Sequence, residues 1–245
     1  MKIKNHLTKF ALAGSVFAIA GLGLVGCSNS SKPVVEEVTT TTTTATSENT
    51  KTSVSNPDEA IALLKSGNAN YVKGVDTTDI SVKTRESLVS GQTPPAVVVT
   101  CSDSRVPAEE IFNAGLGEIF TIRTAGNVID TFESGSVEYA VDHLGSKVVV
   151  VMGHSNCGAV GAAVDGHASG DIQAIVDEIK PAVDEAKKTE TDTKAITSKA
   201  IDLNVMNSIA KLRANSAIKH LEDEGKIKIV GARYDLSTGE VSFFN

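Results

Sequence analysis

The sequence predicts an α/β fold in which a mostly parallel β-sheet is flanked by helices. Short apolar runs alternate with longer helical segments along residues 96–244, which is the pattern of a parallel sheet covered on both faces. Two of these runs, residues 97–100 and 147–152, end next to side chains that bind metals. Ligands at the carboxyl ends of two parallel strands lie where open α/β sheets place their sites.

The first expected element is a helix over residues 58–71, because Asn56 supplies a cap and Pro57 stands in the first turn. This helix precedes the first strand, has no place in the minimal sheet and predicts an N-terminal helical arm. The expected strands cover residues 96–100, 119–123, 147–152, 228–234 and 240–244. The expected later helices cover residues 108–113, 136–144, 171–187 and 197–223, with another beginning at Gly158.

Cys101, His154 and Cys157 predict a catalytic zinc site. Structural zinc usually has four Cys or His ligands, whereas a catalytic site has three and keeps one position for water. Asp103 either accepts a hydrogen bond from the group on the metal or becomes a fourth ligand in a closed state. A bidentate pair with Arg105 favours the first role, because it holds Asp103 ionised and off the metal. These residues indicate a hydrolytic or hydrating enzyme.

An alternative for Asp103 and Arg105 is a purely structural one. The two side chains would then cap a helix that starts near Val106. We favour the catalytic dyad, since a plain cap has no need of the arginine and a metal ligand lies beside it.

Residues 1–26 are expected to be a signal peptide, because three lysines precede an apolar run and small residues precede Cys27. The segment resembles a bacterial lipoprotein signal, which implies cleavage before Cys27 and lipidation of that residue. The expected location is the bacterial cell envelope, outside the cytoplasm, anchored to a membrane. A plain secretory peptide or an uncleaved anchor are the alternatives. Two of the three cysteines are assigned to zinc, so Cys27 has no disulfide partner.

Residues 27–56 are rich in threonine and serine, with six consecutive threonines at 39–44, and predict a disordered tether. Residues 57–245 then form one domain. Loss of residues 1–26 changes the formal net charge from −7 to −10, because that segment holds three lysines and no acidic residue. An acidic chain argues against nucleic-acid binding and leaves the lipid as the membrane contact.

Four motifs together resemble the β-class carbonic anhydrases. They are Cys-Ser-Asp-Ser-Arg at 101–105, Arg-Thr-Ala-Gly-Asn-Val at 123–128, Ser-Val-Glu-Tyr-Ala-Val at 136–141, and Gly-His-Ser-Asn-Cys-Gly-Ala at 153–159. The resemblance implies the β-carbonic anhydrase fold, a Zn²⁺ cofactor, and a homodimer or higher even oligomer. It also implies reversible hydration of carbon dioxide to bicarbonate and a proton by a zinc-bound hydroxide, with Asp103 and Arg105 as the catalytic dyad.

The same resemblance implies a substrate pocket at the dimer interface. Gln92 would hydrogen-bond the substrate oxygens, and Phe120, Val128 and Tyr139 would form an apolar wall. Core packing is the alternative role for both aromatic rings. Gly158 would let the backbone approach the metal-bound oxygen, because its N–H lies at a helix start, where an oxyanion is favoured.

Two other functions are weighed against carbon dioxide hydration. One is hydrolysis of carbon disulfide or carbonyl sulfide on the same scaffold, and the other is a noncatalytic zinc-binding surface protein. The bicarbonate-inhibited branch of the family has a tryptophan where this chain has Val98, which argues against that inhibition. Arg123 is expected to fix backbone or a subunit contact.

Overall fold

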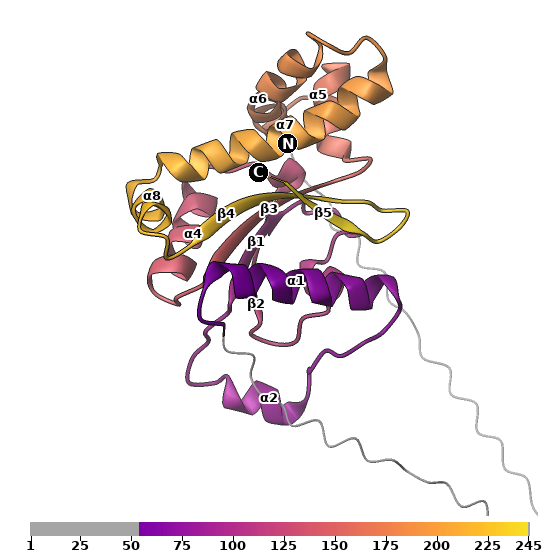
Figure 1. Cartoon of the computed structure of the whole chain (residues 1–245). Helices are drawn as coiled ribbons and strands as arrows, with labels where there is room; N and C mark the ends of the chain where they lie inside the picture. The colour runs from indigo at the N-terminus through magenta and orange to yellow at the C-terminus, as the bar shows by residue number, and fades with distance from the viewer. Residues whose placement is uncertain (1–53, 245) are drawn as a thin grey trace, which may run out of the picture. The chain divides into compact units, whose positions relative to one another are not determined.

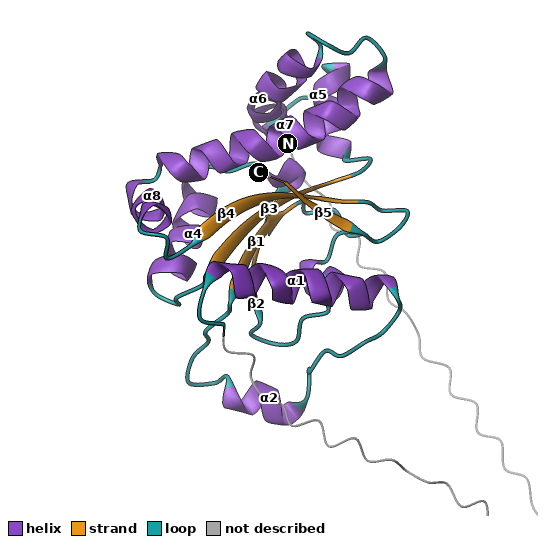
Figure 2. Cartoon of the chain, in the orientation of Figure 1, coloured by secondary structure: helices purple, strands orange, loops and turns teal. Residues whose placement is uncertain are grey.

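The computed structural model describes residues 54–244, which form a five-stranded sheet with helices on both faces (Figures 1 and 2). The predicted signal peptide, Cys27 and nearly all of the predicted tether lie outside the described residues. The strand order is β2-β1-β3-β4-β5. Four strands are parallel, and β5 pairs with β4 in the antiparallel sense. The predicted mostly parallel sheet is confirmed.

The strands are β1 Ala96–Thr100, β2 Ile119–Arg123, β3 Val148–His154, β4 Lys228–Tyr234 and β5 Val241–Phe244. Every residue of β1 and β3 is buried, which explains why both strands consist mainly of apolar residues. The predicted bounds of β1, β2 and β4 are confirmed. The apolar run of the third strand predicts an end at Met152, but β3 pairs with β4 as far as His154. His154 is therefore the last strand residue, held by the sheet.

The helices are α1 Pro57–Val72, α2 Val82–Ser87, α3 Ala108–Ile111, α4 Thr131–Asp142, α5 Gly158–Asp165, α6 Asp171–Ala186, α7 Thr193–Ala214 and α8 Ser216–Asp223. A short 3-10 turn, Ala125–Asn127, follows β2. The cap predicted for the first helix is confirmed, because Asn56 Oδ1 accepts a hydrogen bond from the N–H of Glu59 at 3.0 Å.

Side chains alternate between the two faces of the sheet and build two cores. On one face, Val98 and Val150 pack with α1 and α3. On the other face, Val97 and Val151 pack with α4, α7 and α8. A third cluster joins α5, α6 and α7 around Cys101 and Cys157, beyond the carboxyl ends of β1 and β3 (Figure 1). The candidate ligands are therefore packed where the sheet meets these three helices.

The single helix predicted over residues 197–223 is wrong, because Asn215 divides it into α7 and α8. Asn215 has extended backbone, with ψ at 120°, and its side chain accepts from the N–H groups of Ala217 and Ile218. The helix predicted from Ser136 starts earlier, at Thr131. Its cap is Asp130, which forms a capping box with Glu133.

The first helix packs on its own sheet, because Ala60 and Leu64 are buried in the core with β1 and β3. The apolar face of α1 therefore packs against the sheet of its own chain. Within residues 54–244, no helix combines the length and the apolar character needed to cross a membrane.

Close packing of α1 gives a stability prediction at Gly67. A Cβ atom at this position would lie 1.8 Å from the carbonyl oxygen of Phe112, which is a backbone atom. Gly67→Ala is expected to reduce the free energy of unfolding by about 3 kcal/mol. Gly135, in α4, has open space within 4 Å of the point where a Cβ atom would lie, so Gly135→Ala should raise stability by about 0.5–1 kcal/mol. Urea unfolding measures the stability of both variants. Equal changes in the free energy of unfolding would contradict the packing described for α1.

Candidate active site

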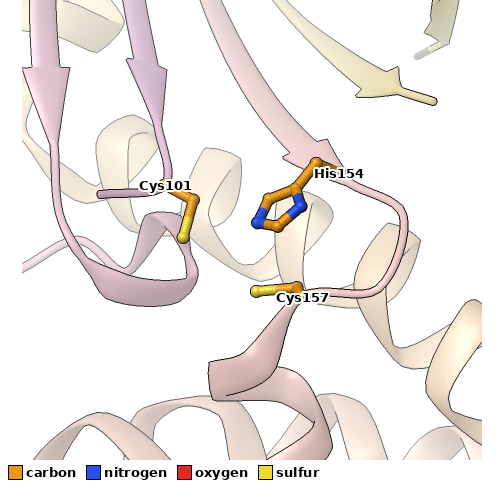
Figure 3. A group of neighbouring side chains, drawn as sticks. All are labelled: Cys101, His154 and Cys157. Atoms are coloured by element: carbon orange, nitrogen blue, oxygen red, sulfur yellow. The ribbon is translucent and has the colours of Figure 1, made fainter. Parts of the chain in front are cut away.

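Three metal-binding side chains converge at the carboxyl ends of β1 and β3. Cys101 directly follows β1, His154 ends β3, and Cys157 immediately precedes α5. Their ligand atoms all lie within 4.8 Å of one another, and all three residues are buried. Figure 3 shows the two sulfur atoms and the imidazole pointing toward a common point. The structure thus brings together the ligand set predicted from the sequence, and Asp103 is not part of that group.

The imidazole of His154 is oriented for metal binding. Its Nδ1 lies 2.9 Å from the carbonyl oxygen of Ser155, which only accepts, so Nδ1 carries the proton. Its Nε2 is therefore a free acceptor, and it is buried without a hydrogen-bond partner. A buried lone pair beside two thiols is costly unless something binds it. The donor set of two sulfurs and one nitrogen fits Zn²⁺.

The two cysteine side chains shift each other's pKa in opposite directions. The pKa of Cys101 is lowered to about 4, chiefly because the thiol of Cys157 donates a hydrogen bond to it. The N–H of Gly126 also donates to Cys101 Sγ, at 3.3 Å. The pKa of Cys157 is raised by the same sulfur–sulfur hydrogen bond and by burial. Cysteine binds Zn²⁺ as the thiolate, so a dication bound by both sulfurs would displace their protons.

Arg123 holds the loop that follows β1. Its Nε donates to the carbonyl oxygen of Cys101 at 3.1 Å, and its Nη2 donates to that of Asp103 at 2.5 Å. The N–H of Ser102 donates to the carbonyl of Thr124 at 3.2 Å, which ties this loop to the end of β2. The expectation that Arg123 fixes backbone is confirmed.

Asp103 and Arg105 form a bidentate ion pair. Arg105 Nε lies 2.9 Å from Asp103 Oδ1, and Arg105 Nη2 lies 2.7 Å from Asp103 Oδ2. These side-chain hydrogen bonds hold the pKa of Asp103 far below its ordinary value. Asp103 Oδ2 lies 3.9 Å from His154 Nε2, so the carboxylate faces the ligand cluster. The capping alternative is wrong, because α3 begins at Ala108 and its N-cap is Pro107.

The predicted pocket residues lie at different distances from the metal ligands. Val128 packs against the cluster that contains the two cysteines, and Gly158 is the exposed first residue of α5. Phe120 pairs with Val97, so it lies about 10 Å along the sheet from the ligand end of β1. Its ring is 6.3 Å from that of Tyr139, which is 48% exposed.

Gln92 lies at the opposite end of β1 from Cys101. It is exposed, and it precedes a strand whose other end carries the metal ligand. The structure therefore does not bring Gln92 to the ligands of its own chain. The substrate roles of Gln92, Phe120, Val128, Tyr139 and Gly158 stay predictions.

Two polar positions that hold the ligand loops were not identified from the sequence. The N–H of Ser155 donates to the carbonyl of Tyr234, and the N–H of Leu236 donates to Ser155 Oγ at 2.9 Å. Asn204, on α7, is 2% exposed and donates to the carbonyl of Gly126 at 2.7 Å. Its partner lies 78 positions away in the sequence, so no local pattern points to this contact.

The family model and the sequence relatives that match this chain are carbonic anhydrases. The family model described as carbonic anhydrase matches residues 96–241. Carbonic anhydrase 2 of Mycobacterium tuberculosis is 40% identical over 192 residues, covering 76% of this chain and 91% of that protein. The carbonic anhydrase of Mycolicibacterium smegmatis is 38% identical over 194 residues, covering 76% of this chain and 93% of that protein.

Solved structures agree with these sequence relatives. A tetrameric β-carbonic anhydrase of Sordaria macrospora superposes with a TM-score of 0.61 at 29% identity, covering 66% of this chain and 85% of that one. The β-carbonic anhydrase CafA of Aspergillus fumigatus gives a TM-score of 0.63 at 26% identity, covering 77% of this chain and 90% of that one. With the two cysteines and the histidine gathered at the carboxyl ends of its parallel strands, the chain belongs to the β-class carbonic anhydrase family.

Proposed function

We propose that this chain is a zinc-dependent carbonic anhydrase that acts at a membrane surface in the cell envelope. Its reaction is the reversible hydration of carbon dioxide to bicarbonate and a proton. The observation that carries this function is the buried Cys101, His154 and Cys157 cluster, whose ligand atoms lie within 4.8 Å of one another. The carboxylate of Asp103 faces that cluster, at 3.9 Å from His154 Nε2.

Each residue of the site has its own role in the reaction. Cys101, His154 and Cys157 would hold the zinc, and the two thiolates would offset the charge of the dication. Bound zinc supplies the Lewis acidity that makes water a nucleophile near neutral pH. Asp103 accepts a hydrogen bond from the reacting water and directs its lone pair toward the carbon of the substrate. Arg105 keeps Asp103 ionised and holds both of its carboxylate oxygens, so that Asp103 does not become a metal ligand.

Stopped-flow measurement of carbon dioxide hydration tests this function. The zinc-loaded protein is expected to accelerate the reaction, and dialysis against a zinc chelator should remove the activity until zinc is restored. The same preparation is assayed with carbon disulfide and carbonyl sulfide. Turnover of the sulfur compounds without carbon dioxide hydration would reassign the substrate, and metal binding without any turnover would leave a noncatalytic zinc protein.

The membrane location is proposed from the resemblance of residues 1–26 to a lipoprotein signal. Cys27→Ser removes the thiol that would carry the lipid. We expect the variant to appear in the soluble fraction of a bacterial host while the unaltered chain sediments with membranes. The hydration rate per zinc should be the same for both. A variant that still sediments with membranes would mean that the apolar leader itself is the anchor.

A homodimer or higher even oligomer is proposed for the assembled enzyme. On α4, Phe132 is 87% exposed and Tyr139 is 48% exposed, and this helix packs beside the edge strand β2. Large exposed apolar side chains near a sheet edge favour a protein contact. Gln92 lies too far along β1 to serve its own site, so its proposed substrate contact is made across the interface. Analytical ultracentrifugation of the soluble Cys27→Ser chain measures the assembly, and a monomer would contradict this proposal.

A further inference from the structure

Helix α7 carries three side-chain donors along one face, at Asn204, Ser208 and Lys211. Each donates to a backbone carbonyl of the segment that follows β2. The bonds are Asn204 Nδ2 to Gly126 O at 2.7 Å, Ser208 Oγ to Asn127 O at 2.9 Å, and Lys211 Nζ to Ile129 O at 3.2 Å. Asn204 is 2% exposed and Ser208 is 3% exposed. Polar side chains buried this deeply are retained only with partners, and here the partners all lie in one loop.

Gly126 is the member of that loop that contacts the metal site. Its N–H donates to Cys101 Sγ at 3.3 Å, while its carbonyl accepts from Asn204. Its φ is +67°, and a Cβ atom would lie 2.7 Å from Ile179 Cδ1, so glycine is needed here. Glycine has the widest backbone freedom of any residue, which means that Gly126 does not fix the direction of its own N–H. The N–H of Asn127 closes the turn by donating to the carbonyl of Thr124 at 3.0 Å, and the Asn204 amide holds the Gly126 carbonyl.

We propose that Asn204 is a positioning residue for the metal centre: by holding the Gly126 carbonyl, it keeps the Gly126 N–H directed at the sulfur of Cys101. An N–H bonded to a thiolate fixes the direction of the sulfur and takes up part of its charge. Asn204 acts through Gly126 and does not touch the ligands. The inference rests on the zinc site of the proposed function, and it adds a residue 78 positions away from Gly126 in the sequence.

Two variants of similar shape test the role of the amide donor. Asn204→Asp replaces the donor with an acceptor, and Asn204→Leu removes the donor without adding charge. Ser208→Ala is the matched control, because it removes a buried bond from the same helix to the next carbonyl in the loop. We expect about 10–100-fold weaker zinc binding for both Asn204 variants, measured by competition with a chromophoric chelator. Zinc binding by Ser208→Ala should be unchanged.

Spectroscopy separates positioning from loss of stability. In the cobalt-substituted protein, the sulfur-to-metal charge-transfer band should shift in the Asn204 variants and stay in place in Ser208→Ala. Thermal unfolding of the metal-free proteins records the structural cost of each change. Loaded Asn204 variants with an unshifted band, or zinc affinity lowered equally in Ser208→Ala, would overturn the proposal.

A measurement on the unaltered chain covers the case in which the Asn204 variants do not fold. In the ¹¹³Cd-substituted protein, a scalar coupling between the Gly126 amide proton and the metal, transmitted through Cys101 Sγ, is expected. Exchange of this amide with solvent should also be slow. Absence of the coupling in a loaded site would overturn the inference alone, whereas failure of the unaltered chain to bind metal would overturn the proposed function.

Discussion

Replacing Arg105 with alanine is expected to lower kcat/KM for carbon dioxide hydration by about 100-fold while zinc remains bound in stoichiometric amount. Arg105 holds both carboxylate oxygens of Asp103 through two hydrogen bonds. Without them, Asp103 is free to leave the orientation in which it accepts from the reacting water. Stopped-flow kinetics with parallel metal analysis measures the two quantities on the same sample.

The chain offers a matched control for Arg105→Ala. Arg213 makes the same bidentate pair with Glu222, at 2.8 and 2.7 Å, between α7 and α8. Arg213→Ala should leave the hydration rate unchanged. Added guanidinium is expected to restore part of the activity of Arg105→Ala, because it can occupy the vacated position. Loss of zinc from Arg105→Ala would reassign the residue to the integrity of the metal site.

Replacing His154 with alanine is expected to remove zinc binding and to lower the hydration rate on the order of 10³-fold or more. His154 supplies the free Nε2 acceptor of the cluster and is fully buried. The two remaining sulfurs make too few ligands for a tight zinc site. Elemental analysis and stopped-flow kinetics measure both losses.

His143 provides the control for His154→Ala. It is the exposed C-cap of α4 and packs its ring 5.5 Å from that of Tyr139. His143→Ala should keep zinc and most of the hydration rate. Far-ultraviolet circular dichroism of both metal-free variants checks that the fold is retained. A His154→Ala protein that is folded and still binds zinc stoichiometrically would show that the ligand set is wrong.

The sequence predicts the strands and the metal ligands well because both have strong local signals. The β1 sequence is apolar up to Thr100, since all five of its residues are buried. Cys101 and His154 mark the ends of two such runs, and strand pairing alone then brings them together. The Asp103–Arg105 pair is also local, because the two residues are separated by a single position.

Other features were missed because their causes are distant or compete with periodicity. Asn215 ends α7 through its extended backbone and caps α8 with its side chain, although the apolar pattern continues into α8. The helix α2 buries none of its six residues, so it leaves no hydrophobic pattern. Asn204 contacts Gly126 across 78 positions, which no local pattern reveals. The cap at Asp130 is different, because it has a local sequence signal: Glu133 follows at the spacing of a capping box.

X-ray absorption at the zinc edge of the purified, active protein identifies the atoms that bind the metal. Two sulfur ligands and one imidazole nitrogen are expected from the chain, supplied by Cys101, Cys157 and His154. Cys101→Ser should lower the sulfur count by one. An active preparation that contains no zinc, or a zinc ion with a different number of sulfur neighbours, would contradict this ligand set.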